Sequence, residues 1–165
     1  MRVVIVSDTH IPKRAKQLPA ALVKGLKKAD VILHAGDWVD LSVYRELSRF
    51  APVYGVAGNC DPPKVRKAFG ARRILELDGW RIGIVHGDGQ KGTTQNRALA
   101  AFEGEKLDLI IFGHSHLPYK ARHGRTLLFN PGSPTDRRRN PLYSYGVASL
   151  GEKLQVQHVY FKSRL

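Results

Sequence analysis

Short apolar runs alternate with helical patterns over roughly the first third of the chain. Residues 2–6, 31–35 and 53–57 are apolar runs of strand length and predict buried strands. Between them, apolar residues recur with helical spacing at 18–29 and 41–50. Because parallel strands need a long crossover, usually a helix, this order predicts a parallel β-α-β-α-β arrangement.

The pattern changes after residue 72. Asp78-Gly79 separates two alternating apolar runs in RILELDGWRIGIV, which is a strong hairpin signal. The C-terminal third is therefore expected to be mostly antiparallel. The other expected elements are a helix near 94–103, a strand at 108–112, hairpin turns around His123-Gly124 and Gly151, and loops at 62–63 and 131–141.

The composition is typical of a globular protein. The 165 residues are 42% hydrophobic and 25% charged, which suits a single domain spanning 1–165. No apolar run approaches the about 20 residues that a membrane span needs. The first apolar run is too short for a signal peptide and lacks a small-residue cleavage site, so we expect none. The one cysteine, Cys60, has no partner for an internal disulfide. We therefore expect a cytoplasmic protein without a membrane association.

The charge is strongly basic. The chain has 27 Lys and Arg against 14 Asp and Glu, a formal net charge of +13. A positive field attracts nucleic acids, nucleotides and phosphorylated metabolites, and it fits equally well a basic surface that aids solubility. The basic residues are scattered and no aromatic-interleaved basic stripe is present, so sequence-specific DNA reading is not supported.

Side chains that can bind metal follow five of the predicted strands. Ligands bind outside the carboxyl ends of the strands in open α/β sheets, so these side chains should converge on one edge. Four of the five strand ends also carry a glycine, which lets the backbone turn sharply and come close to a bound ion or phosphate. The candidate metal ligands are Asp8, His10, Asp37, Asn59, His86, His114 and His116.

This set is larger than one ion usually takes and suits two ions that share a bridging carboxylate. In the pairs Asp8/His10 and His114/His116, a separation of two residues in an extended segment would direct both side chains to the same side. Carboxylate, amide and imidazole donors without a thiolate favour Mn²⁺, Fe, Co²⁺, Ni²⁺ or Zn²⁺ over Ca²⁺ or Mg²⁺.

Each position also has a structural explanation. Taken singly, Asp37, Asn59 and His86 fit ordinary turn chemistry or a satisfied loop histidine. However, four of the seven histidines occur at strand ends together with acidic and amide groups, and turns have no use for imidazole. The combination favours a metal site. His34 lies inside a strand, where it either supports the ligands from behind or packs in the core.

The ordered motifs Asp-x-His, Gly-Asp, Gly-Asn, His-Gly and Gly-His-x-His resemble those of the calcineurin-like metallophosphoesterase superfamily. With FNPGSP at 129–134, the chain is similar to the small prokaryotic phosphodiesterases of that superfamily. The resemblance extends from Asp8 to Ser133. It implies an α/β fold, namely an αββα sandwich of two mixed β-sheets flanked by helices.

The resemblance also implies a centre of two divalent transition-metal ions, with Mn²⁺ the leading candidate. It assigns one ion to Asp8, His10, Asp37 and His116, and the other to Asp37, Asn59, His86 and His114, with Asp37 as the bridge. A hydroxide held between the ions would attack phosphorus in line, while the ions neutralise charge on the phosphoryl oxygens. Asp37, Asn59 and His114 are the residues expected to act in catalysis.

Two positions depart from the family pattern. Many members have a histidine directly after Gly-Asn that helps to bind the phosphate and protonates the leaving group, whereas this chain has Cys60. A neutral thiol is a poor substitute for imidazole at pH 7, so we expect diesters or esters with good leaving groups as substrates. The alternative is a small buried Cys60 without chemistry. Asp88 stands where relatives often have a second histidine.

The leading hypothesis is a metal-dependent phosphodiesterase that hydrolyses a small or nucleotide-like phosphodiester. Asn59, Cys60 and Arg137 are the expected substrate contacts, although the arginine run 137–139 also fits a solvated surface loop. One alternative is a non-catalytic interaction scaffold of the same fold, like the retromer subunit, but a scaffold does not need a complete ligand set. The other is a metal-dependent nuclease, which usually carries additional domains. The sequence leaves the native substrate and the oligomeric state open, a homo-oligomer included.

Overall fold

The computed structural model describes all of residues 1–165, which form ten strands and four helices. The strands are β1 (Arg2–Val6), β2 (Val31–His34), β3 (Val53–Gly55), β4 (Arg72–Leu77), β5 (Trp80–Val85), β6 (Leu109–Ile111), β7 (Tyr119–His123), β8 (Thr126–Asn130), β9 (Tyr143–Leu150) and β10 (Leu154–Phe161). The helices are α1 (Ala20–Leu26), α2 (Leu41–Ser48), α3 (Pro63–Phe69) and α4 (Thr94–Ala101).

The strands form two five-stranded sheets. The order is β10-β9-β1-β2-β3 in the first sheet and β4-β5-β6-β8-β7 in the second. In the first sheet β1, β2 and β3 are parallel, and β9 and β10 continue the sheet with antiparallel pairing. In the second sheet the parallel strands β5, β6 and β8 are flanked by antiparallel β4 and β7. The prediction of two mixed sheets is confirmed.

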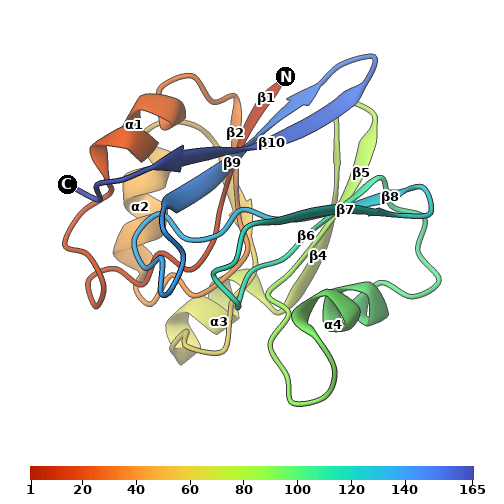
Figure 1. The fold of residues 1–165 in the computed structure, drawn as a ribbon, viewed down its shortest axis with the longest axis horizontal. Coiled ribbons are helices and arrows are strands. Elements are labelled where there is room, and N and C mark those ends of the chain that lie inside the picture. Colours follow the sequence, from red (N-terminus) through yellow and green to blue (C-terminus); the bar gives the residue numbers. More distant parts are fainter.

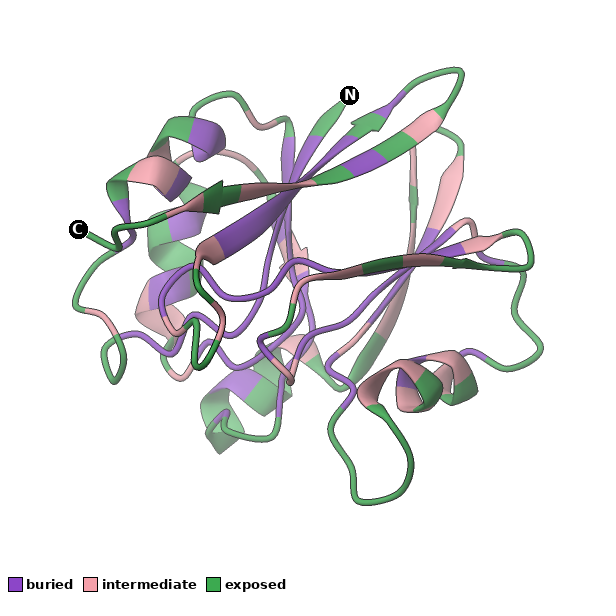
Figure 2. Ribbon diagram, viewed as in Figure 1, coloured by how far each residue is buried: buried purple, intermediate pink, exposed green.

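The two sheets pack face to face with helices outside them. In Figure 1, α1 and α2 lie outside the first sheet, α4 lies on the opposite side by the second sheet, and α3 lies at the lower edge. Figure 2 shows that the central strands and several loops below them are buried, whereas the outer helix faces are exposed. These layers are the αββα sandwich that the motifs imply.

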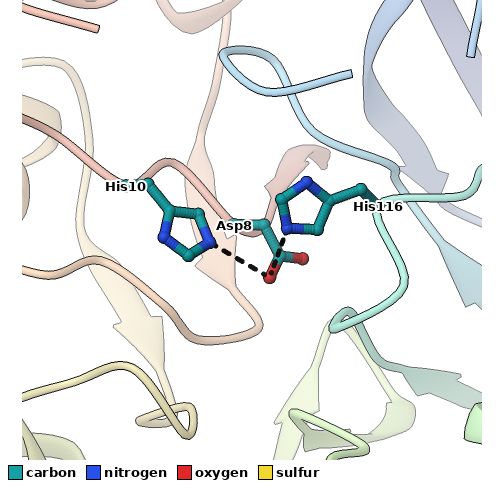
Figure 3. Close-up of side chains that lie close together, drawn as sticks. All are labelled: Asp8, His10 and His116. Atoms are coloured by element: carbon teal, nitrogen blue, oxygen red, sulfur yellow. Dashed lines mark ion pairs between the residues drawn. The ribbon is translucent and has the colours of Figure 1, made fainter. Parts of the chain in front are cut away.

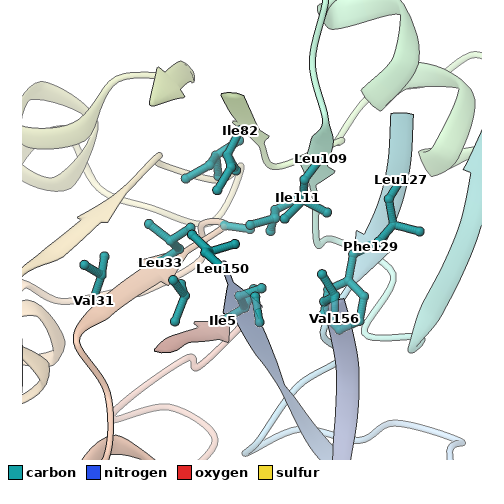
Figure 4. Packing of buried hydrophobic residues seen from close by; sticks show 14 of the residues in the cluster. Ile5, Val31, Leu33, Ile82, Leu109, Ile111, Leu127, Phe129, Leu150 and Val156 are labelled. Atoms are coloured by element: carbon teal, nitrogen blue, oxygen red, sulfur yellow. The ribbon is translucent and has the colours of Figure 1, made fainter. Parts of the chain in front are cut away.

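Residues that alternate along β1 enter different parts of the core. Val3 and Ile5 belong to a cluster of 15 buried residues between the sheets, where Ile5 faces side chains of the second sheet such as Ile111 and Phe129 (Figure 4). Val4 and Val6 belong to a second cluster of 15, which packs against α1 and α2. Each fully buried aliphatic side chain contributes about 2 kcal/mol of transfer free energy, so both faces hold β1 in place.

The predicted loop at 62–63 is wrong in part, because these residues begin α3. Pro62 is the N-cap and Pro63 the first helical residue. Proline suits this position, since its fixed φ fits the helix and the first N–H groups have no intrahelical partner. Gly70, with φ 70°, follows the last helical residue. The other predicted elements are present, most of them a few residues shorter than the pattern suggests.

Loops from the two sheets meet at one edge of the sandwich. The backbone N–H of Asp8, after β1, donates to Gly36 O after β2 at 2.9 Å. In the second sheet the N–H of Gly113, after β6, donates to His86 O after β5 at 3.0 Å. The sheets are joined where the His114 N–H donates to Asp8 Oδ2 at 3.0 Å. None of the helices is long and apolar enough to cross a membrane.

Candidate metal centre

The loops after β1 and β6 bring three predicted ligands to one point. His10 Nε2 lies 3.8 Å from Asp8 Oδ1, and His116 Nε2 lies 3.5 Å from the same oxygen (Figure 3). Ligand atoms of all three residues lie within 4.8 Å of one another, and all three residues are buried. This group can hold one cation.

The loops after β2 and β5 supply a neighbouring group. His86 Nε2 lies 3.1 Å from Asp37 Oδ2 and 3.7 Å from Asp8 Oδ1. Asp37 Oδ2 also lies 3.5 Å from His10 Nε2, so this carboxylate faces both groups. That position is the one a bridging ligand between two cations would occupy.

Asn59 and His114 complete the set on the solvent side. His114 Nδ1 lies 3.2 Å from Asn59 Oδ1, and the rings of His114 and His86 are 5.3 Å apart in an edge-on arrangement. Asn59 is exposed and His114 is half-buried. The structure therefore brings all seven predicted ligands together, with these two at the open edge.

Four buried polar atoms in this cluster have no hydrogen-bond partner. They are Asp8 Oδ1 and the Nε2 atoms of His10, His86 and His116. Leaving one buried polar atom unpaired costs about 1–3 kcal/mol, so four that converge on one place indicate a bound group. Imidazole nitrogens combined with carboxylate oxygens fit divalent transition-metal ions.

Hydrogen bonds at the second ring nitrogen fix the orientation of two of these imidazoles. His86 Nδ1 lies 2.7 Å from Ala35 O, and His116 Nδ1 lies 2.6 Å from Asp136 O. A carbonyl oxygen only accepts, so Nδ1 carries the hydrogen in both rings. When the ring is neutral, Nε2 then presents its lone pair to a cation.

In each carboxylate, hydrogen bonds hold one oxygen in place and leave the other oxygen free. Asp8 Oδ2 accepts from Ser7 Oγ at 2.8 Å and from the His114 N–H, which leaves Oδ1 directed at the imidazoles. Asp37 Oδ1 accepts from the Cys60 N–H at 2.8 Å, which leaves Oδ2 for His10 and His86. Both carboxylates therefore offer a positioned oxygen.

The charges of the cluster depend on one another. Burial opposes the ionisation of Asp8, but His86 and the adjacent imidazoles outweigh burial and hold its pKa well below the usual value. Burial alone would lower the pKa of His86, whereas the Asp8 and Asp37 carboxylates raise it to about 9. The pKa of His114 is lowered by burial and then by His86. A bound cation would replace the proton that His86 otherwise carries opposite the Asp8 and Asp37 carboxylates.

Five of the seven ligands have a left-handed backbone: φ is 56° at Asp8, 43° at His10, 60° at Asp37, 71° at His114 and 60° at His116. This region is uncommon for residues with a side chain, costs roughly 1–2 kcal/mol each and clusters at functional sites. The expectation that the two histidine-containing pairs lie in extended segments is therefore wrong. Left-handed turns, and not strand alternation, direct their side chains.

At two positions the backbone lies so close to a ligand side chain that only glycine fits. A Cβ at Gly58 would overlap Asp37 Oδ1, and a Cβ at Gly113 would overlap Ser7 Oγ and lie 2.7 Å from Asp8 Oδ2. The glycines were expected to make room for an ion or a phosphate. The structure shows that these two make room for the metal-binding carboxylates.

Asp61 is a supporting residue that the sequence analysis missed. Its buried carboxylate accepts three backbone N–H groups, from Gly58 at 2.7 Å, Val39 at 2.7 Å and Asp37 at 2.9 Å. Burial raises the pKa of Asp61, and these hydrogen bonds oppose the rise. Asp61 thus ties the loop that carries Asp37 to the loop that carries Asn59. The available signal was an acidic residue that follows Gly-Asn closely and precedes two prolines.

His34 supports the site from the core. Its Nδ1 accepts from the Gly36 N–H at 3.0 Å, so Nε2 carries the hydrogen and donates to Thr9 Oγ1 at 3.0 Å. The ring stacks on Trp38 with a centroid distance of 3.7 Å, and burial lowers the pKa of His34 to about 3. Both sequence-based alternatives therefore hold: His34 is a neutral core residue, and it fixes the residue between Asp8 and His10.

The segment 131–135 is a second support outside the predicted ligand set. It is buried, and Ser133 Oγ donates to Asp8 O at 2.8 Å. Thr135 Oγ1 donates to the carbonyl of Thr9. The loop after β8 thereby holds the loop after β1, which explains why NPGSP accompanies the ligand motifs.

Cys60 lies beside the cluster and is exposed, so the alternative of a small buried cysteine is wrong. Its Sγ, a carboxylate oxygen of Asp37 and a ring nitrogen of His10 lie within 4.8 Å of one another. Burial of part of the thiol and the nearby Asp37 carboxylate raise the pKa of Cys60. The thiol is therefore neutral at pH 7 when no cation is bound.

The neighbouring arginines Arg137 and Arg138 make different contacts. The Arg137 guanidinium lies over the Tyr143 ring, 5.5 Å from its centroid, and donates to Asn140 O at 2.8 Å. Arg138 instead donates to His114 O at 3.4 Å. The structure thus places Arg138, and not Arg137, in contact with a predicted ligand, and substrate binding by Arg137 stays a prediction.

A cavity of about 370 Å³ adjoins the open edge of the cluster. Asn59, Arg66 and Asp88 contribute polar groups to its wall. Arg66 Nη2 donates to Asn59 O at 3.1 Å, and Arg66 Nε donates to Asp61 O at 2.8 Å. One cationic and one anionic side chain therefore line a space directly beside a predicted ligand.

The fold is an αββα sandwich, and carboxylates, imidazoles and one amide lie together at its strand ends. This combination is typical of metal-dependent phosphoesterases. The sequence matches the calcineurin-like phosphoesterase superfamily domain over residues 1–153, and the chain belongs to this family. Membership of this family supports the assignment of the chain as a phosphoester hydrolase that uses divalent metal ions.

Individual relatives agree with this assignment. A probable metallophosphoesterase of Methanothermobacter thermautotrophicus is 34% identical over 162 residues, which cover 95% of this chain and 91% of the relative. An archaeal phosphodiesterase structure matches with a TM-score of 0.73 and 22% identity, covering 98% of this chain and 100% of that one. Vps29 of Entamoeba histolytica complexed with Zn²⁺ matches with a TM-score of 0.74 and 20% identity, covering 97% and 99%. These two structures show the shared fold.

Proposed function

We propose that this protein is a phosphodiesterase that works with two divalent transition-metal ions. The observation that carries the proposal is the convergence of Asp8 Oδ1 with three imidazole Nε2 atoms, all buried and without a partner. Mn²⁺ is the leading candidate, and Ni²⁺, Co²⁺, Zn²⁺ and Fe are the alternatives that the same donors accept.

The chain would divide its ligands between the two ions. Asp8, His10 and His116 form the buried group, Asn59, His86 and His114 form the group nearer solvent, and Asp37 faces both. Bound divalent cations would supply Lewis acidity toward a phosphoryl oxygen and lower the pKa of a water molecule. Asn59 and His114, at the open edge, would orient the phosphoryl group against the buried ligands.

A small diester is the substrate that fits the surroundings best. The cavity beside Asn59 offers about 370 Å³, which suits one nucleotide-sized group. Arg66 and Asp88 in its wall can contact polar substituents of that group. Asn59, Cys60 and Arg137 are the proposed substrate contacts, with Arg137 the weakest of the three because Tyr143 and Asn140 engage its guanidinium. A cytoplasmic location is part of the same proposal.

The test is a metal-reconstituted activity screen over phosphomonoesters, phosphodiesters, cyclic nucleotides and DNA. We expect the highest kcat/KM on a small diester, with Mn²⁺ the best activator. Asp37→Ala removes the shared carboxylate and His114→Ala a solvent-side ligand, so each should reduce kcat/KM by at least about 10²-fold. Purified wild-type protein that binds none of these metals and is inert with all of them would contradict the proposal.

Two other functions lead to different results in the same screen. The fold shared with Vps29 supports a non-catalytic scaffold, which predicts metal binding without turnover on any substrate. The net charge of +13 supports a nuclease, which predicts turnover on DNA that falls steeply with salt. The complete ligand set favours the phosphodiesterase over the scaffold, and the scattered basic residues, which form no aromatic-interleaved stripe in the sequence, favour it over the nuclease.

A further inference from the structure

We propose that the Cys60 thiol is a variable ligand of the ion held by His10 and Asp37, coordinating Zn²⁺ or Co²⁺ but not Mn²⁺. The proposal rests on the metal centre described above. Its geometric basis is that Cys60 Sγ, a ring nitrogen of His10 and a carboxylate oxygen of Asp37 lie within 4.8 Å of one another. The sequence-based ligand set contains no sulfur atom.

His10 provides an independent indication that a cation belongs at this point. Its side chain is only 10% exposed, and its Nε2 atom is buried without a hydrogen-bond partner. This nitrogen lies 3.5 Å from Asp37 Oδ2. The two residues that lie near the thiol, His10 and Asp37, therefore already belong to a predicted ion position, and Cys60 adds a third donor to it.

The loop holds the Cys60 backbone while leaving its side chain free. The Cys60 N–H donates to Asp37 Oδ1 at 2.8 Å, and Asp61 fixes the preceding Gly58 through its N–H at 2.7 Å. The only hydrogen bond of the sulfur is a long one from Asn59 Nδ2, at 3.7 Å. Rotation of one exposed side chain about χ1 is therefore enough to move Sγ relative to the ion.

The coordination step balances without an oxidant or a reductant. The S–H bond breaks, its proton passes to solvent, and the resulting thiolate donates an electron pair to the cation. Zn²⁺ and Co²⁺ bind thiolate well, with a Zn–S distance of about 2.3 Å, whereas the harder Mn²⁺ prefers oxygen and imidazole ligands. Cys60 would therefore change the coordination number of the site according to the metal present.

Sulfur coordination also affects the reaction. A thiolate on the ion occupies a position that a phosphoryl oxygen or water would otherwise take. We expect the Zn²⁺ and Co²⁺ forms to be slower than the Mn²⁺ form. Cys60→Ser should increase the ratio of kcat with Zn²⁺ to kcat with Mn²⁺ by about tenfold, because it frees one coordination position of the Zn²⁺ form.

Absorption spectroscopy of the Co²⁺-reconstituted protein tests the proposal directly. Because Cys60 is the only cysteine, a thiolate-to-cobalt charge-transfer band in the near ultraviolet can come from no other residue of the chain. We expect this band in the wild-type protein and not in Cys60→Ser or Cys60→Ala. All three proteins should retain the weaker visible cobalt bands, which report metal binding by the other ligands.

The visible and near-ultraviolet bands distinguish metal binding by the other ligands from coordination by sulfur. Visible bands without a charge-transfer band in the wild-type protein would overturn sulfur coordination and leave the metal centre intact. Absence of both would contradict the metal centre itself. A charge-transfer band that disappears on dilution would show cobalt bridging two molecules, which also overturns the proposal. In competition, Cys60→Ser should lower the preference for Zn²⁺ over Mn²⁺ by at least about tenfold.

Discussion

His86 Nε2 lies 3.1 Å from Asp37 Oδ2, while the Nδ1 atom of the same ring is bonded to Ala35 O. The ring is thus held on one side by the backbone and faces two carboxylates, those of Asp37 and Asp8, on the other. Without a cation these carboxylates outweigh the effect of burial and raise the pKa of His86 to about 9. A proton and a metal ion therefore compete for one lone pair.

This competition predicts that metal affinity rises with pH. Below the His86 pKa of about 9 the ring must release one proton to bind an ion, so affinity should rise up to about tenfold per pH unit and level off above pH 9. The check is calorimetric titration of Mn²⁺ at several pH values from about 6.5 to about 9.5, so that the range includes the pKa of His86. Repeating it in buffers of different ionisation enthalpy should reveal the released proton. Affinity independent of pH, with no proton release, contradicts the prediction.

Metal removal should destabilise the protein through the shared carboxylate. A ligand at about 100 times its Kd stabilises the folded state by about 2.7 kcal/mol, so Mn²⁺ should increase Tm by several degrees and EDTA should reverse the increase. Asp37→Ala should abolish the metal-dependent shift, because Asp37 faces both ion groups. Glu152→Ala, at an exposed position, is the matched control and should keep the full shift. An equal shift in both variants would place the bound metal elsewhere.

Asp61 should matter more than an exposed aspartate that makes similar contacts. Asp61→Ala leaves the N–H groups of Asp37, Val39 and Gly58 without their acceptor, which should destabilise the fold by on the order of 3 kcal/mol and weaken metal binding. Asp40 caps α2 through Ser42 N–H at the surface, so Asp40→Ala should cost at most about 1 kcal/mol and leave metal affinity unchanged. Urea denaturation and metal titration of both variants make the comparison. Similar losses in the two would show that Asp61 has no special role at the site.

The sequence predicts the strands and the identities of the ligands better than it predicts the backbone conformation of the loops that carry these ligands. Apolar runs identify β1 and β2 because both strands are buried on both faces, and the polar strand ends follow directly. The left-handed φ values at Asp8 and His114 have no such signal, because nothing local in the sequence requires them. They depend on partners distant in sequence, such as the bond from the His114 N–H to Asp8 Oδ2. For Asp61 the sequence offers only an acidic residue close behind Gly-Asn, and its acceptor role exists only after the β2 and β3 loops are folded together.

The two neighbouring arginines should differ in their effect on substrate binding. Arg138 contacts the carbonyl of His114, whereas the Arg137 guanidinium is engaged by Tyr143 and Asn140. We expect Arg138→Ala to increase KM for a diester severalfold, with a smaller increase for Arg137→Ala, because Arg137 must leave its contacts to reach a phosphate. Steady-state kinetics at fixed Mn²⁺ measures both, with Arg139→Ala as the control from the same exposed run. A larger increase for Arg137→Ala would support the original sequence-based assignment instead.

The residue at position 60 should determine how the rate depends on the leaving group. The exposed Cys60 thiol has a pKa raised by partial burial and by Asp37, so it cannot supply a proton as readily as an imidazole. Rates on a series of aryl phosphodiesters should therefore fall steeply as the leaving group becomes more basic. Cys60→His restores an acid beside Asn59 and should increase the rate for the most basic leaving group by about tenfold, below the 10²–10⁴ of an optimised acid. Cys60→Ser should keep the steep dependence. Wild-type rates independent of leaving-group basicity, with chemistry rate-limiting, would mean that another group of the protein supplies the proton.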